Sequence, residues 1–130
     1  MIENLYKSIV EATSLHKKLL AILIDPDVFN VASAAAFLRR IPADTTHIFV
    51  GGSSVPDGKT SDVVKVLKHC TAKPIVLFPG DVSQITDEAD GLLFLSLLSG
   101  RNPEYLIGQH VRAVAKLKHA ELEIMSTAYL

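Results

Sequence analysis

The sequence is poor in cysteine and in long apolar runs, and it has no tryptophan. Cys70 is the single cysteine among 130 residues, which excludes an internal disulfide and favours a reducing setting. No apolar run reaches the roughly 18 residues of a membrane span, and the charged N-terminus lacks the apolar core of a signal peptide. We therefore expect a cytoplasmic protein without a membrane span.

An excess of charge of either sign is also absent. Lys and Arg number 13 and Asp and Glu 14, so no net field draws the chain to nucleic acid or to an anionic membrane. No repeat or Gly/Ser-rich linker divides the sequence, and 48% of its residues are apolar. We expect a single domain over residues 1–130 and no nucleic-acid partner.

Motifs for zinc and for a nucleophilic cysteine are missing as well. The five histidines include no i, i+4 pair and no HExxH, which leaves zinc without support. His110 lies on an expected helix and is interpreted as a surface or packing residue, and nothing marks Cys70 as a nucleophile. Asp87, Glu88 and Asp90 are interpreted as a solvated loop.

The sequence does contain five short apolar runs. They lie at residues 19–24, 47–50, 74–78, 91–98 and 121–130. Most are continuous, which is typical of strands covered on both faces in a parallel sheet. The last run still reads as a strand at Leu130, so we expect the chain to be truncated.

Helical segments with recognisable ends lie between these runs. Asn30 precedes a helix over 31–40, Thr60 or Ser61 caps a second, and Asn102 and Pro103 begin a third. The faces expected to be buried are Leu5, Ile9, Ala12 and Leu15 in an opening helix, Val63, Val64, Leu67 and Cys70 after Ser61, and Leu106, Ile107, Val111, Val114 and Leu117 after Pro103. The pattern predicts an α/β fold with a parallel sheet and right-handed crossovers.

One connection is too short for an ordinary crossover. The stretch GDVSQITDEAD, residues 80–90, joins the third apolar run to the fourth. A parallel crossover usually needs a dozen residues or more. The helix here is expected to be missing or reduced to a turn.

Candidate site residues follow the ends of the apolar runs, where parallel sheets bind ligands. Asp25 and Asp27 flank Pro26 directly after the first run, and Ser53 follows two glycines after the second. Magnesium takes one or two protein carboxylates and leaves other positions to water and phosphate, so Asp25 with Ser53 suits it. The alternative is that Asp25 and Asp27 only shape a turn or cap the next helix.

The stretch GGSSVPDGKT imitates a phosphate-binding P-loop. Its glycines could bring backbone N–H groups close to a phosphate. The P-loop pattern, however, needs a glycine five positions before Gly58, where this chain has Ser53, and Pro56 interrupts the loop. A nucleotide-binding module that depends on Lys59 is therefore the weaker reading.

Four stretches taken in order resemble the geranylgeranylglyceryl phosphate synthase family. They are LIDPD, FVGGSS, VLFPG and LFLSLLSGRNPEYLIGQHV, of which the last is the most specific. The resemblance, which runs from about Lys18 to the chain end, implies a modified TIM barrel with an altered third helix. It also implies transfer of a polyprenyl group from its diphosphate to the 3-hydroxyl of sn-glycerol 1-phosphate, with Mg²⁺, in ether-lipid biosynthesis.

The same resemblance implies roles for individual residues. Asp25 would be the magnesium carboxylate, Ser53 its hydroxyl ligand, and Asp27 a support behind them. Residues implied to line the prenyl diphosphate are Gly51, Gly52, Ser99, Asn102 and Tyr105. One departure is Val28, which stands where many relatives have a lysine that could help to hold phosphate.

A complete barrel needs roughly 200 to 250 residues, so the resemblance implies the N-terminal half of one, with about five parallel strands. The family's glycerol-phosphate site and its proton acceptor lie on the other half, so no catalytic residue is assigned here. We expect the chain to retain the magnesium and diphosphate half-site and to be inactive alone.

Unpaired strand edges and uncovered apolar surface favour a homo-oligomer or a complementary chain. The competing readings are a receiver-like magnesium-binding domain and a fragment that serves only as an interaction surface. A receiver would also need a second acidic residue beside the first and a lysine after the fifth strand, which the run EIMSTAYL lacks.

Overall fold

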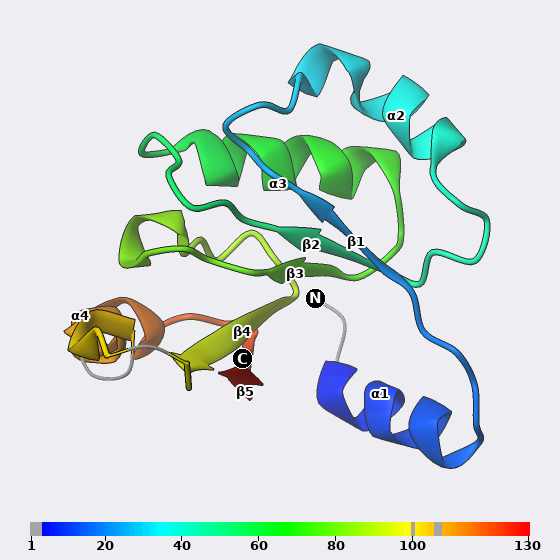
Figure 1. Cartoon of the computed structure of the whole chain (residues 1–130). Helices are drawn as coiled ribbons and strands as arrows, with labels where there is room; N and C mark the ends of the chain where they lie inside the picture. The colour runs from blue at the N-terminus through cyan, green and yellow to red at the C-terminus, as the bar shows by residue number, and fades with distance from the viewer. Residues whose placement is uncertain (1–3, 100, 106–107) are drawn as a thin grey trace.

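A five-stranded parallel sheet forms the centre of the molecule (Figure 1). The computed structural model describes residues 4–99, 101–105 and 108–130. The strands are β1 (Ala21–Ile24), β2 (His47–Val50), β3 (Ile75–Leu77), β4 (Gly91–Leu97) and β5 (Glu123–Tyr129). All neighbouring pairs are parallel, and β4 and β5 pair along their whole length. The predicted α/β fold with about five parallel strands is confirmed.

The strands lie in the sheet in the order in which they occur in the sequence, β1-β2-β3-β4-β5. A receiver-like sheet has the strand order 2-1-3-4-5, so the direction in which successive strands are added reverses at a switch point. Here each connection adds the next strand to the same edge of the growing sheet, which is the arrangement found in barrels. The receiver-like reading is therefore wrong.

The helices agree with the predicted segments, with differences at their ends. They are α1 (Leu5–Ser14), α2 (Ala34–Arg40) preceded by the 3₁₀ turn η1 (Val31–Ser33), α3 (Lys59–Cys70), and α4 (Gly108–Leu117) preceded by the 3₁₀ turn η3 (Pro103–Tyr105). Asn30 and Asn102 both accept from backbone N–H groups at these starts. The predicted cap at Thr60 or Ser61 is wrong, because Gly58 precedes α3 and Thr60 is buried in its first turn.

The short link between β3 and β4 is confirmed. In place of a crossover helix it holds only a 3₁₀ turn, η2 (Val82–Gln84). Asp81 begins the turn by accepting from the backbone N–H of Ser83 at 2.8 Å. After the turn the chain re-enters the sheet beside the start of β3, where the N–H of Asp90 donates to the carbonyl of Ile75 and Gly91 pairs with Val76.

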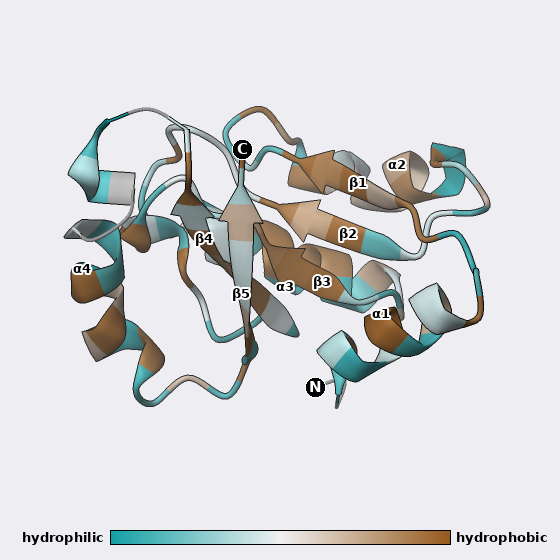
Figure 2. Cartoon of the chain, turned by 60° about the horizontal axis from the view of Figure 1, so that its bottom comes forward, coloured by the Kyte–Doolittle hydropathy of each residue, from teal (hydrophilic) through white to brown (hydrophobic). Residues whose placement is uncertain are grey.

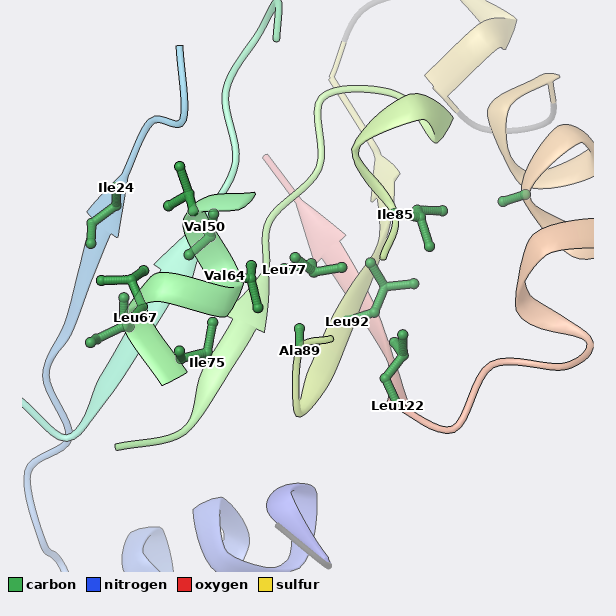
Figure 3. Close-up of a cluster of buried hydrophobic side chains, with 13 residues drawn as sticks. Ile24, Val50, Val64, Leu67, Ile75, Leu77, Ile85, Ala89, Leu92 and Leu122 are labelled. Atoms are coloured by element: carbon green, nitrogen blue, oxygen red, sulfur yellow. The ribbon is translucent and has the colours of Figure 1, made fainter. Parts of the chain in front are cut away.

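The larger hydrophobic core lies between one face of the sheet and helices α2, α3 and α4 (Figure 3). Val63, Val64 and Leu67 of α3 are fully buried in it, as predicted. Cys70 is exposed, contrary to prediction, because α3 ends there. The prediction that Val111 and Val114 of α4 are buried is wrong.

Helix α4 packs through a different stripe. Ala113 is buried and Leu117 is half-buried, whereas Val111 and Val114 remain 67% and 59% exposed. Ala113 and Leu117 are the side chains through which α4 joins the larger core. The predicted contacts of Leu106 and Ile107 lie outside the described residues.

A smaller core lies on the other face of the sheet, under α1. Leu5 packs there against Val76 of β3 and Met125 of β5. The carboxylate of Glu123, at the start of β5, accepts from the backbone N–H of Leu5 at 2.5 Å and so caps the helix. Leu15, predicted to face inward, is 64% exposed.

Helix α1 covers only the end of the sheet where the strands begin, as the view onto this face shows (Figure 2). Farther along, Leu23 is 57% exposed and Tyr129 is 46% exposed. Complete covering of both faces, predicted from the continuous apolar runs, is therefore wrong for this face. An apolar surface remains open near the carboxyl ends of the strands.

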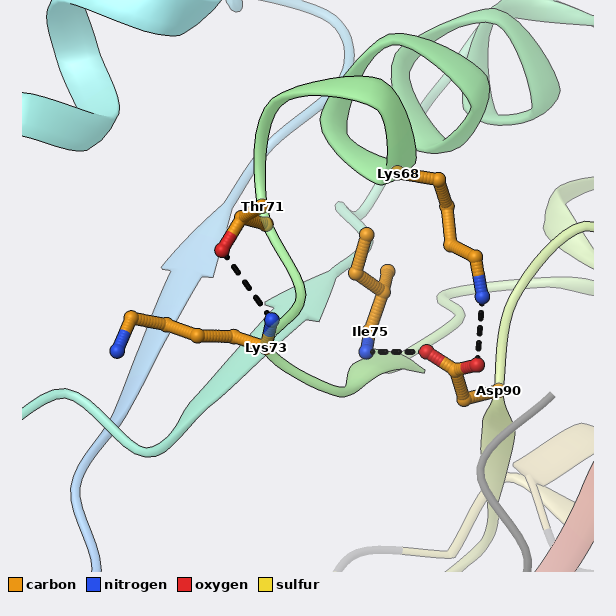
Figure 4. Close-up of polar contacts among 5 residues, drawn as sticks. All are labelled: Lys68, Thr71, Lys73, Ile75 and Asp90. Atoms are coloured by element: carbon orange, nitrogen blue, oxygen red, sulfur yellow. Dashed lines mark hydrogen bonds and ion pairs between the residues drawn. The ribbon is translucent and has the colours of Figure 1, made fainter.

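Asp90 is buried, which corrects its interpretation as part of a solvated loop (Figure 4). Its carboxylate accepts from Lys68 Nζ at 2.6 Å and from the backbone N–H of Ile75 at 2.9 Å. A buried carboxylate costs free energy unless it is paired and hydrogen-bonded in this way. The pair ties the start of β4 to α3 and β3.

Stability is expected to fall in mild acid because of His47. Burial lowers the pKa of His47 below its ordinary 6.5. As the pH falls below about 6.5, the unfolded chain takes up a proton at this histidine that the folded chain resists, so the free energy of unfolding decreases, by at most about 1.4 kcal/mol per pH unit. Urea denaturation between pH 7.5 and 5.5 measures this slope.

His47→Gln should flatten the slope, and His69→Gln, at an exposed histidine, should leave it as in the wild type. Identical slopes in the wild type and His47→Gln would show that His47 is protonated equally in both states.

Candidate functional site

Three loops meet at the carboxyl ends of β1, β2 and β3, and glycines allow the contact. A Cβ at Gly51 would overlap the carbonyl oxygen of Phe78, and one at Gly80 would overlap the carbonyl oxygen of Gly52. A Cβ at Gly52 would overlap the carboxylate of Asp25. Only glycine permits such close backbone approach, so the sequence brings three loops into one compact rim.

Asp25 stands directly after β1 and is half-buried. Its Oδ1 accepts from the backbone N–H of Asp27 at 2.9 Å, and its carbonyl accepts from the N–H groups of Val28 and Phe29. The turn-shaping role considered from the sequence is therefore present. The carboxylate also lies against Gly52, which places it at the rim where the two loops meet.

Gln84 of η2 holds the Gly52 backbone from the other side. The N–H of Gly52 donates to Gln84 Oε1 at 3.0 Å, and Gln84 Nε2 donates to the carbonyl of Gly52 at 2.6 Å. The side chain is almost fully buried. The sequence interpretation missed this residue, and its only signal was a polar side chain between Val82 and Ile85 in a link too short for a helix.

Lys59, at the start of α3, reaches the turn after β1. Its Nζ donates to the carbonyl of Asp27 at 2.5 Å and lies 3.9 Å from the Asp27 carboxylate. The amine is engaged with protein oxygens, and Gly58 before it is in the left-handed region at φ 82°. Asp27 is thus linked to the third helix and is exposed.

An apolar groove of about 350 Å³ opens beside this rim. Its polar end is formed by the loop from Gly51 to Ser53 and by Gly80 and Asp81. Its walls are mainly apolar side chains, among them Leu23, Leu93, Phe94, Leu95, Leu97 and Tyr129. The arrangement suits an amphiphile with a polar head at the rim and an apolar tail along the strands.

His110 lies in the wall of the groove and not on an open surface. Its Nε2 lies 2.5 Å from the carbonyl oxygen of Leu95, and its ring packs at 4.4 Å from that of Phe94. The packing role assigned to it from the sequence agrees with these contacts. Its position beside the groove was not predicted.

Two of the residues predicted after β4 do not line the groove. Ser99 and Asn102 are exposed, and neither is among the described residues that line the groove. Asn102 Oδ1 instead accepts from the N–H of Glu104 at 3.0 Å. Tyr105 ends η3, and its side chain lies outside the described part of the chain.

Donors for a cation at the rim are oxygen atoms. Asp25 keeps one carboxylate oxygen that makes no hydrogen bond within the described residues, and the exposed Ser53 hydroxyl follows Gly52 in the adjoining loop. No group of three His, Cys, Asp or Glu side chains capable of holding a metal occurs in the part of the chain that the structure describes. This donor set fits Mg²⁺, which needs few protein ligands when phosphate supplies others, and it does not fit zinc.

Comparison with known families gives a clear match. The family described as the PcrB family matches residues 13–130. A geranylgeranylglyceryl phosphate synthase of Zunongwangia profunda is 51% identical over 95% of this chain and 53% of its own length. One of Flavobacterium johnsoniae is 47% identical over 100% of this chain and 54% of its own. The chain spans about half the length of the curated relatives it matches.

A solved structure shares the fold. The (S)-3-O-geranylgeranylglyceryl phosphate synthase of Thermoplasma acidophilum, in complex with substrate sn-glycerol-1-phosphate, superposes with a TM-score of 0.83 at 28% identity. The match covers 99% of this chain and 53% of that one. The resemblance identified from the sequence is confirmed. In the described residues, no helix has the length and apolar character that crossing a membrane requires.

Proposed function

This chain belongs to the PcrB family, and from that premise we propose that it takes part in the transfer of a polyprenyl group from its diphosphate to sn-glycerol 1-phosphate, in ether-lipid biosynthesis. Within that reaction we assign to it the magnesium and prenyl-diphosphate half of the site. A cytoplasmic location, as expected from the sequence, belongs to the same proposal.

The groove is the observation that carries this assignment. One end is polar and includes Gly52, against which the Asp25 carboxylate lies, although Asp25 is not among the residues that line the groove. The body is lined by leucines and aromatic rings. Among the described residues, the backbone N–H groups of Ser53 and Gly80, which both line the groove, make no hydrogen bonds, so they remain available to an anion at the polar end. A prenyl diphosphate has the same division into a charged head and an apolar tail.

Asp25 and Ser53 would hold the cation in this proposal. Bound magnesium would neutralise the diphosphate and make it a better leaving group. Ser53 and Gly80 would orient the head through their N–H groups, and Asp27 would support the turn that carries Asp25. Ser99, Asn102 and Tyr105 are kept as proposed contacts to the substrate.

The apolar walls have their own part in the chemistry. Cleavage of the carbon–oxygen bond gives allylic cation character, which water would capture in an open site. Leu93, Leu95 and Tyr129 line the space beside the rim with apolar groups, which would limit the access of water to a bound prenyl group. No side chain is assigned as the acceptor of the glycerol proton.

Binding and turnover measurements test the proposal together. The purified chain should bind geranylgeranyl diphosphate by calorimetry only when Mg²⁺ is present, and it should form no product with sn-glycerol 1-phosphate when no other polypeptide is added. Binding that does not depend on Mg²⁺ would contradict the metal assignment. Substantial product formation would contradict the restriction to half of the site.

Association of the chain with a second copy or a complementary chain is a further part of the proposal. β1 and β5 are the outer strands of the described sheet, and Leu23, Ile124 and Tyr129 on them are each more than 40% exposed. Exposed apolar strands at sheet edges favour pairing with another chain. Sedimentation at tens of micromolar should show dimers or larger species. A sharp monomer peak would contradict this expectation.

A further inference from the structure

Gln84 has a polar side chain in a position where an apolar one would pack more simply. It is 1% exposed, and both polar atoms of its amide bond the backbone of one residue, Gly52. Burying an amide costs free energy unless its polar atoms are hydrogen-bonded. Here the oxygen and the nitrogen each make a hydrogen bond. The side chain therefore fixes one peptide segment in position and orientation at the rim.

The fixed segment is the one that Asp25 rests against. A Cβ at Gly52 would meet both carboxylate oxygens of Asp25, and a Cβ at Gly80 would meet the Gly52 carbonyl oxygen and Gln84 Nε2. Gly52 is thus enclosed by the Asp25 carboxylate on one side and by Gln84 and Gly80 on the other. The Asp27 N–H holds one oxygen of the Asp25 carboxylate, and any shift of the Gly52 backbone would change the surface against which the carboxylate packs.

Gln84 is itself anchored through η2 to α4. The N–H of Val82 donates to Gln109 Oε1 at 3.1 Å. Lys116 Nζ donates to the carbonyl oxygens of Val82 and Ile85, each at 3.2 Å. The turn that replaces the crossover helix is therefore held at three points, which gives Gln84 a rigid base.

We propose that Gln84 is a positioning residue for the rim site. It turns the Gly52 N–H away from any ligand and holds the Asp25 carboxylate in one orientation, which leaves anion contacts to the N–H groups of Ser53 and Gly80. The inference rests on the proposed function in one respect, namely that the carboxylate serves a divalent cation.

Hydrogen exchange of the Gly52 amide in the intact chain tests directly whether Gln84 fixes the Gly52 backbone. Gln84→Met keeps the length of the side chain and removes both hydrogen bonds, so Gly52 exchange should accelerate about tenfold relative to the amides of β3. Ser83→Ala, at an exposed neighbour in the same turn, should change it less than about twofold.

Binding of Mn²⁺, followed by its electron paramagnetic resonance signal, separates this inference from the proposed function. Gln84→Met should weaken Mn²⁺ binding about tenfold, as loss of a supporting contact to a metal ligand does, and Ser83→Ala should not. If the wild type binds no Mn²⁺, the proposed metal site is wrong. The exchange rates alone then show whether Gln84 fixes the Gly52 backbone. Gly52 exchange in Gln84→Met within twofold of the wild type would overturn the inference, as would unchanged Mn²⁺ affinity.

Discussion

Replacing Asp25 by asparagine is expected to weaken Mn²⁺ or Mg²⁺ binding about 100-fold or more, since the variant removes the only carboxylate proposed as a ligand. The fold should be preserved. The Oδ1 atom of asparagine can still accept from the N–H of Asp27, and the side chain keeps its size beside Gly52. Calorimetric titration of the divalent cation, together with thermal melting, measures both effects.

Asp57→Asn is the matched control for this change. Asp57 is exposed in the same rim region, between β2 and α3, so the variant removes one negative charge without touching Asp25 or Gly52. Its cation affinity should stay within about twofold of the wild type, because exposed charges at a distance are screened. Equal losses in both variants would mean that the affinity reflects general charge and not a site at Asp25.

The Gly51→Ala variant is expected to lose about 3 kcal/mol or more of its free energy of unfolding. The added Cβ would overlap the carbonyl oxygen of Phe78, which is backbone and cannot move without separating β2 from β3. Urea denaturation followed by circular dichroism should show a much lower midpoint or no cooperative transition.

Gly58→Ala is the comparison variant, because it would destabilise the chain through backbone strain and not through overlap of atoms. Gly58 has φ 82°, and no atom lies within 4 Å of the place that a Cβ would take, so alanine there meets only conformational strain. That strain costs about 1–2 kcal/mol. A loss at Gly51 no larger than the loss at Gly58 would show that the loops at the rim are not packed as closely as described.

The functional interpretation depends on keeping these two effects apart. A variant such as Asp25→Asn changes the chemistry of the rim and leaves the packing of the loops intact. Gly51→Ala changes the packing and would disturb every group at the rim at once. Only the first kind of variant can test the assignment of a cation.

Strand and helix positions were accessible from the sequence because they depend on local patterns. Continuous apolar runs predicted the five strands, and Asn30 and Asn102 marked the starts of helical segments, as the structure confirms. The short stretch after Gly80 predicted the lost crossover helix, since chain length alone limits what it can form.

The buried faces were less accessible. Val111 and Val114 follow helical spacing and yet are exposed, because α4 packs against the core through Ala113 and Leu117 on another side of the helix. Asp90 follows two charged residues and yet is buried, because Lys68 and the N–H of Ile75 are brought to it from elsewhere in the chain. Spacing indicates which residues share a face but does not say which face another element covers.

For the candidate site, the sequence by itself determined the residue types and their place at the ends of strands. Asp25, Gly52 and Ser53 follow apolar runs, and in a parallel sheet such positions share one edge. Only the tertiary structure decided that Gly52 touches the Asp25 carboxylate and that Gln84, 32 residues farther along, binds the Gly52 backbone. Contacts of that kind depend on how the loops pack together in space, which no local pattern in the chain encodes.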